Sequence, residues 1–586
     1  MADMSRNFLL VAAIDFGTTY SGYAFSTRHQ FATERERIFA FQWASSVGRL
    51  ISPKTPTCAL FKPDKSLDSC GFRAEERYAE LASDNSHRNW YFFKRIKMKM
   101  YQKQHFERNF VLEDDTFHED KDPMLAIDVF SAILKFFKDH LLGECWKQLP
   151  EMNIGETDIR WVLTVPAIWN DSAKQFMREA AEMAGLPKEN LFLALEPEAA
   201  SLFCKLIPTL TMVERKHIFK RGTKYIVFDA GGGTIDITVH KVLSSGNLEE
   251  VHKASGGDWG ATRVDEQFVE LLSDLFTHEV YRAFINNHKY DELDLMEDFE
   301  VKKRSLGLDV TSITIKMPNS LLQTYSDMHP DLELTNRILS IPKYSNKVKL
   351  VADKLKMDSD IVRELFSSSC NPIVQHLRSI MIKQSVKDAK TLLLVGGFSE
   401  SAYLQDTILT HFPDLTIIIP SEPSLAVVKG AVLYGHDPLI LESRICKLTY
   451  GVATNMPFED GLDPEDCVVE DESGNRFCTN RFSVHVRIGQ LLETNSYQTS
   501  HTYRTLKKEQ NDLRFYIYTS RSDNPRYTTD SGCEYLGQLT LRMPKSKNSK
   551  DRSAHVKMKF GGTELVVSAK ETVSRKKVEA KLKLLD

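Results

Sequence analysis

The sequence lacks the features of a membrane-spanning or a disulfide-stabilised protein. No apolar run approaches the ~20 residues that a membrane helix needs, since the longest candidates, Leu392–Val395 and Leu415–Pro420, have the length of a strand. The nine cysteines are scattered and odd in number, and none lies in a C-x-x-C or other zinc-binding spacing. We therefore expect a cytoplasmic protein with free thiols and no membrane span.

A global excess of positive charge is also missing. The 76 Lys and Arg residues are outnumbered by 80 Asp and Glu residues, which gives a formal net charge of -4. Nucleic-acid-binding domains usually carry a clear basic excess, and local basic patches such as Arg575–Lys577 are short. We expect no nucleic-acid partner.

The sequence does contain a Gly/Thr turn between two strand-like segments. The apolar run Phe8–Ile14 ends at Asp15, Gly17-Thr18-Thr19 turns the chain, and Tyr20–Ser26 resumes a strand pattern. The same order returns in the middle of the chain, as Tyr225–Phe228, Asp229, Gly231–Thr234 and Ile235–His240. The repetition predicts a duplicated lobe.

Strands and helices alternate over much of the chain before residue 440, which predicts a layered α/β core. Trp161–Val165 is a strand-like run that precedes a helical stretch, and Thr391–Val395 precedes a third glycine turn at Gly396-Gly397. From about residue 264 to 385 the pattern is mainly helical, with a strand-like interlude near Ser312–Met317. Beyond residue 445, alternating segments such as Leu539–Met543 lie between polar turns, which predicts an all-β domain.

The glycine turns have the chemistry of phosphate-binding loops. Glycine lets backbone N–H groups approach a polyphosphate without a Cβ atom in the way, and Thr18 and Thr234 add hydroxyl donors. Asp15, Asp229 and Asp236 offer the carboxylate oxygens that Mg²⁺ favours, and we expect them to act through its water ligands. Because phosphoryl transfer depends mostly on positioning and charge neutralisation, this set predicts ATP binding and hydrolysis.

Several stretches jointly resemble the heat-shock 70 kDa protein family, and most of all its divergent 12A/12B branch. They follow the family's order and are Ala13–Gly22, Thr164–Lys174, Leu195–Ala200, Val227–Asp236, Gly256–Gly260 and Leu394–Ser401. The resemblance implies an α/β, two-lobed, actin-like (ribonuclease H-like, duplicated) ATPase domain over residues 8–440. Lobe I would cover about 8–220, lobe II about 221–415, and residues 416–440 would return to lobe I. Residues 441–586 would form a β-rich, sandwich-like domain for a substrate or partner, with no helical lid after it.

The resemblance also implies a set of site residues, with ATP or ADP and Mg²⁺ as cofactors. The catalytic residues would be Lys94, which acts on the terminal phosphate, Glu196 near the metal, and Asp15, Asp229 and Asp236, which surround hydrated Mg²⁺. The nucleotide would contact Gly17, Thr18, Thr19, Tyr20, Gly231, Gly232, Gly233, Thr234, Gly256, Gly257, Glu300, Lys303, Arg304, Gly396, Gly397 and Phe398. Pro166 and Lys174 would couple nucleotide state to the second domain. For the helix that carries Glu300, Lys303 and Arg304, a solvated charged face is the alternative interpretation.

Departures from the family pattern fall on the adenosine half of the site. Phe398 and Glu400 stand where typical members have Ser and Arg, and Gly307 replaces a serine. The arginine that stacks on adenine is therefore missing on one side, and Arg304 and Phe398 are expected to supply that surface. Lys174 replaces an arginine of the coupling switch.

Three functions are compatible with these patterns. The first is a chaperone-like slow ATPase that couples nucleotide state to a polypeptide client, with a J-domain protein and a nucleotide-exchange factor as further partners. The second is a nucleotide-binding adaptor with little turnover. The third is a small-molecule kinase of the actin-like superfamily, since fold alone does not fix function, although no acceptor pocket with a carboxylate base is evident.

Overall fold

The computed structural model describes residues 8–581, except for residues 46–50, 85, 102–108, 116–120, 153, 207–217, 439–440, 472, 495, 506–509, 544–551 and 562–563. The chain divides into two compact units. The first comprises residues 1–169, 176–239 and 254–437, and the second comprises residues 170–175, 240–253 and 438–586. None of the helices in the described ranges combines the length and apolar character that crossing a bilayer requires.

The first sheet of the first unit carries the first glycine turn. Its strand order is β13 (Leu191–Leu195), β12 (Ile159–Val165), β1 (Leu10–Asp15), β2 (Tyr20–Thr27) and β3 (Phe39–Ala40), and β6 (Thr55–Pro56) also pairs with β2. β1 runs parallel to β12 and antiparallel to β2, with Asp15 opposite Gly22. Every residue of β1 and β12 is buried, which explains their continuous apolar runs.

The second sheet repeats this arrangement around the second glycine turn. The first five of its seven strands are, in order, β21 (Thr416–Ile418), β20 (Thr391–Val395), β14 (Lys224–Ala230), β15 (Ile235–Val242) and β16 (Leu248–Gly257). β14 runs parallel to β20, with Asp229 opposite Val395. Two smaller sheets have the orders β8 (Leu67–Cys70), β7 (Cys58–Phe61), β9 (Tyr91–Lys94) and β17 (Ser312–Lys316), β19 (Lys354–Asp358), β18 (Val348–Val351).

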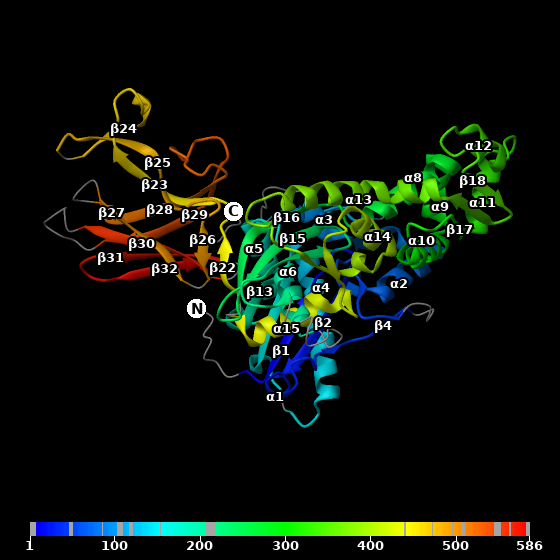
Figure 1. Cartoon of the computed structure of the whole chain (residues 1–586), viewed down its shortest axis with the longest axis horizontal. Coiled ribbons are helices and arrows are strands. Elements are labelled where there is room, and N and C mark those ends of the chain that lie inside the picture. Colours follow the sequence, from blue (N-terminus) through cyan, green and yellow to red (C-terminus); the bar gives the residue numbers. More distant parts are fainter. Residues whose placement is uncertain are drawn as a thin grey trace. The chain divides into compact units, whose positions relative to one another are not determined.

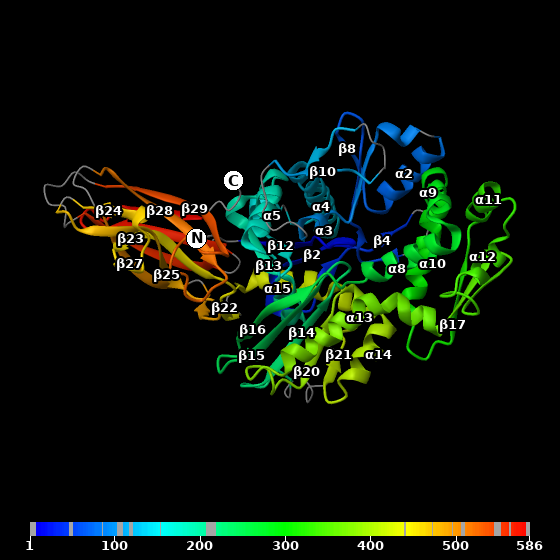
Figure 2. The same cartoon turned by 90° about the horizontal axis from the view of Figure 1, so that it is seen from above.

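Helices surround these sheets (Figure 1). They are α1 (Arg28–Thr33), α2 (Phe72–Ser83), α3 (Ile96–Tyr101), α4 (Ala126–Gln148), α5 (Asp171–Met183), α6 (Glu196–Cys204), α8 (Thr262–Phe276), α9 (His278–Asn287), α10 (Lys289–Ser305), α11 (Asn319–Met328), α12 (Leu334–Ser340), α13 (Ser359–Met381), α14 (Ala402–His411) and α15 (Ala426–His436). The long helix α13 packs against α8 and α14 (Figure 2). The chain thus has the mixed α/β content expected from its sequence.

Helices α6 and α15 meet at a glycine. A Cβ atom at position 430 would lie 1.7 Å from the carbonyl oxygen of Ala199 and 2.3 Å from its carbonyl carbon. Gly430 is therefore required for the close approach of the two helix backbones.

We expect the substitution Gly430→Ala to lower the free energy of unfolding by about 1–3 kcal/mol, because the added methyl group forces α15 away from α6. Gly143→Ala is a matched control, since Gly143 also lies in a helix and its added Cβ would meet nothing within 4 Å. That control should be neutral or stabilising by about 0.5–1 kcal/mol. Denaturant unfolding of both variants measures the difference, and equal effects would contradict this packing.

The second unit contains two antiparallel sheets. One has the order β24 (Val468–Glu470), β25 (Arg476–Val486), β23 (Thr449–Pro457), β28 (Asp512–Ser520) and β29 (Cys533–Arg542). The other has the order β27 (Tyr497–Arg504), β30 (Ser553–Gly561), β31 (Glu564–Glu571) and β32 (Lys577–Lys581). The shorter strands β22 (Leu441–Ile445) and β26 (Leu491–Glu493) pair with each other.

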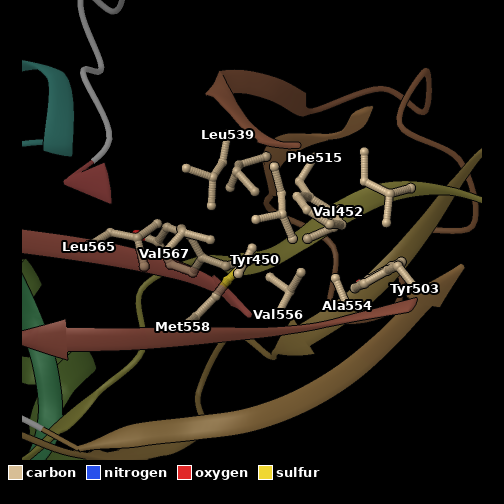
Figure 3. Close-up of a cluster of buried hydrophobic side chains, with 14 of the residues drawn as sticks. Tyr450, Val452, Tyr503, Phe515, Leu539, Ala554, Val556, Met558, Leu565 and Val567 are labelled. Atoms are coloured by element: carbon tan, nitrogen blue, oxygen red, sulfur yellow. The ribbon is translucent and has the colours of Figure 1, made fainter. Parts of the chain in front are cut away.

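One hydrophobic core joins the two sheets of this unit (Figure 3). Val452 and Phe515 come from the five-stranded sheet, and Val556, Met558 and Val567 come from the four-stranded sheet. All five side chains are buried. The alternating pattern of the tail thus places its apolar side chains on two facing surfaces.

Candidate functional site

The two glycine turns lie against each other in the first unit. A Cβ atom at position 232 would lie 2.1 Å from Thr19 Oγ1, and one at position 233 would lie 2.7 Å from Thr18 Oγ1. The turn between β14 and β15 therefore touches the turn between β1 and β2, far away in the sequence. Only glycine permits this approach.

Each turn is also closed by its own hydrogen bonds. Gly17 N donates to Ser21 Oγ at 3.1 Å, and Thr57 Oγ1 donates to the Gly17 carbonyl at 2.9 Å. In the second turn, Gly231 N donates to the Thr234 carbonyl at 3.0 Å. These bonds restrain the backbone of both turns.

Both turns line a cavity of about 150 Å³. Most of the residues expected to bind phosphate line it, namely Gly17, Thr18, Thr19, Tyr20, Gly231, Gly232, Gly233, Thr234, Gly396 and Gly397. Asp15, Glu196 and Asp229 line it as well, and so do Lys54 and Lys97. Backbone N–H groups, hydroxyl groups, carboxylates and ammonium groups thus meet in one small space.

Asp15 ends β1 and is buried. Its Oδ1 accepts a hydrogen bond from Thr164 Oγ1 at 2.8 Å, and its Oδ2 lies 2.5 Å from Lys54 Nζ. Burial alone would raise the pKa of this carboxyl, but the charges of Lys54 and Lys97 and the hydrogen bonds outweigh it and hold the pKa below its ordinary value. Asp15 is therefore ionised at neutral pH.

Asp229 has the opposite environment. Burial raises its pKa well above the ordinary value, and the nearby carboxylates of Glu196, Asp236 and Asp15 raise it further. The third glycine turn adjoins it, because Gly396 has φ of 88° and a Cβ atom there would lie 2.4 Å from Asp229 Oδ1. A positive charge placed beside this carboxyl would lower its pKa.

Asp236 is held by the second turn and by the segment after β12. Its Oδ2 accepts from Thr234 Oγ1 at 3.3 Å, and its Oδ1 accepts from the backbone N–H of Ile168 at 2.9 Å. Pro166, which was expected to couple the domains, is buried two residues before Ile168. The other expected coupling residue, Lys174, forms an ion pair with Asp171 at 3.3 Å.

Glu196 pairs with a lysine that the sequence did not single out. Lys97 Nζ lies 2.6 Å from Glu196 Oε1, and both side chains are buried. Burial, together with the carboxylates of Asp15 and Asp236 and despite Lys97, raises the pKa of Glu196 to about 7. Lys97 thus places an ammonium group at the cavity wall.

Lys94, the lysine expected at the terminal phosphate, lines a different space. It contributes to a neighbouring cleft of about 960 Å³, together with Glu75 and Glu292. The charge of Lys289 and burial lower the pKa of Lys94. Among the residues that line the smaller cavity, Lys97 and Lys54 are present and Lys94 is not.

The expected adenosine residues form a charged cluster in this larger cleft. Lys303 bridges Glu300 at 2.5 Å and Asp265 at 2.6 Å, while Arg304 bonds Glu300 at 2.9 Å and Glu400 at 3.3 Å. Burial alone would raise the pKa of Glu300, but the charges and hydrogen bonds of Lys303 and Arg304 outweigh it and lower the pKa to about 2. The helix face is thus a partly buried network rather than the solvated charged face that was the alternative interpretation.

Of the remaining expected contacts, one lines the larger cleft and two line neither space. Phe398 is buried and lines the larger cleft, which Tyr20 and Gly397 also line. Gly256 and Gly257 line neither space. A Cβ atom at position 256 would lie 1.8 Å from the Ile235 carbonyl oxygen, so Gly256 has a packing role in this structure.

The acidic residues fit a hydrated divalent cation better than a directly ligated one. Within the described ranges, no three His, Cys, Asp or Glu side chains come close enough together to hold a metal ion directly. Asp15 and Asp229 nevertheless line one cavity, and Asp236 adjoins it through Thr234. Carboxylates gathered at one cavity can hold Mg²⁺ through its water ligands.

Comparison with known proteins gives matches to one family. The family model "Hsp70 protein" matches residues 54–483. The chain is 32% identical to heat shock 70 kDa protein 12A of Mus musculus, over 99% of this chain and 92% of that protein. It is also 32% identical to heat shock 70 kDa protein 12B of Homo sapiens, over 100% and 92%. The chaperone protein dnaK of Cyanidium caldarium is 26% identical over 58% of this chain and 50% of its own length.

Proposed function

Because the chain belongs to the Hsp70 family, we propose that it binds ATP and ADP at the cavity between the two glycine turns and hydrolyses ATP slowly. The observation that supports this most is the direct approach of Gly232 and Gly233 to Thr19 and Thr18. Two turns in contact place backbone N–H groups and hydroxyl groups on both sides of a phosphate chain. The proposal also includes a cytoplasmic location and coupling of nucleotide state to a polypeptide partner.

In this proposal Mg²⁺ would be held through water by Asp15, Asp229 and Asp236, and it would supply charge neutralisation at the phosphates. The raised pKa of Asp229 favours this role, because a buried carboxyl among other carboxylates ionises when a cation is added beside it. Asp15 and Asp229 lie at or next to the ends of β1 and β14, just before the two turns, and would orient the attacking water between them.

We assign the phosphate-directed lysine to Lys97 rather than to Lys94. Lys97 lines the phosphate cavity, and its partner Glu196 fixes its ammonium group at 2.6 Å. A lysine held in this way can neutralise charge on the terminal phosphate without reorganisation. Lys94 would instead contribute to the wall of the larger cleft.

The adenosine moiety would occupy the larger cleft beside Arg304 and Phe398. Arg304 is held by Glu300 and Glu400, which keeps its guanidinium plane fixed for stacking. The same two carboxylates also favour the second candidate, an adaptor that binds nucleotide with little turnover, because an arginine already paired twice gains less from a ligand.

The β-rich second unit would hold the polypeptide partner. We propose that its two sheets form a sandwich and that an extended peptide adds to it through main-chain hydrogen bonds. Among the described strands of the five-stranded sheet, β29 lies at one end of the order, next to β28. Peptides of this kind add to the end strand of a sheet, which makes β29 a candidate edge.

The coupling is tested by measuring the affinity of an unstructured client peptide in ATP and in ADP. We expect the two affinities to differ by roughly 5-fold or more, as is typical of coupled sites, and the difference to vanish in the Asp229→Asn variant. A J-domain protein and a nucleotide-exchange factor are added in separate arms. Tight peptide binding that is indifferent to nucleotide would leave the adaptor function instead.

A further inference from the structure

The side chain of Lys54 occupies a position at the phosphate cavity that no part of the site described so far uses. Its Nζ lies 2.5 Å from Asp15 Oδ2, and only 13% of the side chain is exposed. Asp15 Oδ1 is already taken by Thr164. The ammonium group of Lys54 therefore neutralises the Asp15 carboxylate, which a bound metal cation would otherwise do.

The surrounding backbone makes room for this lysine. Lys54 lies between β5 (Ile51–Ser52) and β6, and β6 pairs with β2. Gly22 of β2 is the register partner of Asp15, and a Cβ atom at position 22 would lie 3.0 Å from Lys54 Cγ and 3.0 Å from the Pro53 carbonyl oxygen. The glycine thus allows the lysine stem to cross β2 and reach Asp15.

Lys54 is one of several charged residues that line the phosphate cavity. Asp15, Glu196 and Asp229 line the cavity, and Lys54 and Lys97 face them. Lys97 is fixed on Glu196, so Lys54 is the second ammonium group within the same space. An ammonium group on a four-carbon stem has three donors and can turn from a carboxylate to a phosphate oxygen over a short distance.

We propose that Lys54 is a phosphate ligand that leaves Asp15 when ATP enters and supplies part of the positive charge that a divalent cation otherwise provides. The inference rests on the proposed nucleotide function and adds to it that ATP binding persists without Mg²⁺. Charge-assisted hydrogen bonds from lysine to phosphate are strong in a site that excludes water. Asp15, released from Lys54, is then available to the water around the nucleotide.

The test compares ATP affinity by calorimetry in Mg²⁺ and in EDTA for wild type and for Lys54→Met. We expect the wild type to lose less than about tenfold of its affinity in EDTA. Relative to wild type, the loss of ATP affinity caused by Lys54→Met should be at least about tenfold larger in EDTA than in Mg²⁺. Without Mg²⁺, nothing compensates for the missing charged hydrogen bond. Lys62→Met, at an exposed lysine outside the site, is the matched control and should behave as wild type.

A double variant separates this role from a purely structural one. If Lys54 only neutralises Asp15, Asp15→Asn/Lys54→Met regains wild-type affinity in EDTA, and the inference is overturned. If Lys54 binds phosphate, the double variant stays weak. Equal EDTA-to-Mg²⁺ ratios in wild type and Lys54→Met also overturn the inference alone, whereas a wild type that does not bind ATP even in Mg²⁺ overturns the proposed function itself.

Discussion

Replacing Lys97 by methionine is expected to lower the rate of ATP turnover by roughly 100-fold, the usual cost of losing one preorganised charge at a reacting phosphate. Lys97 Nζ is fixed 2.6 Å from Glu196 Oε1 at the wall of the phosphate cavity. Methionine keeps the length of the stem and removes the charge. Steady-state release of inorganic phosphate, measured at saturating ATP, gives the rate.

Lys94→Met is the matched control, because it removes the same charge three residues earlier in the chain. Lys94 lines the larger cleft and not the phosphate cavity, so turnover should stay within about threefold of wild type, less than 1 kcal/mol of barrier. The reverse order, with Lys94→Met inactive and Lys97→Met active, would show that Lys94 acts on the terminal phosphate.

The loss of a buried ion-pair partner can also unfold a protein, so the Lys97→Met/Glu196→Gln variant is needed as well. It removes both charges of this ion pair, so position 196 no longer holds a buried carboxylate that has lost its lysine. We expect this variant to fold with a thermal midpoint near that of wild type and to remain inactive. Recovered turnover in the double variant would mean that Lys97 serves only to neutralise Glu196.

The sequence could not predict which of Lys94 and Lys97 lines the phosphate cavity. Both lie in a short run rich in lysine, Lys94–Lys99, without any periodic signal. β9 ends at Lys94, Arg95 has φ of 53°, and α3 begins at Ile96. A left-handed residue between a strand and a helix redirects the next side chains, and no local pattern predicts that direction.

The strands that carry the glycine turns could be predicted, because their signal is local. β1 is an apolar run that ends at Asp15, and β14 contains an apolar run that leads to Asp229, one residue before its end. Such a pattern can be recognised without any information from distant residues. The contact between the two turns is different in kind. It depends on Gly232 meeting Thr19 across the chain, and it is visible only in three dimensions.

Other parts of the fold were missed for the same reason. The stretch from 264 to 385 was expected to be mainly helical with one strand-like interlude, and β17 is found there. Strands β18 and β19 also occur, joined at Ala352 with φ of 53°. Their residues are mostly Lys, Leu and Val, which do not separate strand from helix over four or five positions. Pairing decides their structure, because β19 pairs with β17 on one side and with β18 on the other.

The Gly232→Val variant is expected to lose more than about 100-fold of its ATP affinity, or about 2.7 kcal/mol of binding free energy. A Cβ atom at position 232 would lie 2.1 Å from Thr19 Oγ1 and 2.7 Å from Thr19 Cγ2. The valine must push the two turns apart, and the backbone N–H groups then no longer converge on the phosphates. Gly143→Val, at a helix position with nothing within 4 Å, is the matched control.

A calorimetric titration of ATP into wild type and Gly232→Val, with thermal unfolding to show that both are folded, tests the nucleotide site most directly. We predict one ATP per chain for wild type and for Gly143→Val, and no measurable heat of binding for Gly232→Val under the same conditions. Undiminished ATP binding by a folded Gly232→Val variant, or no binding by wild type, would contradict a nucleotide site between the two glycine turns.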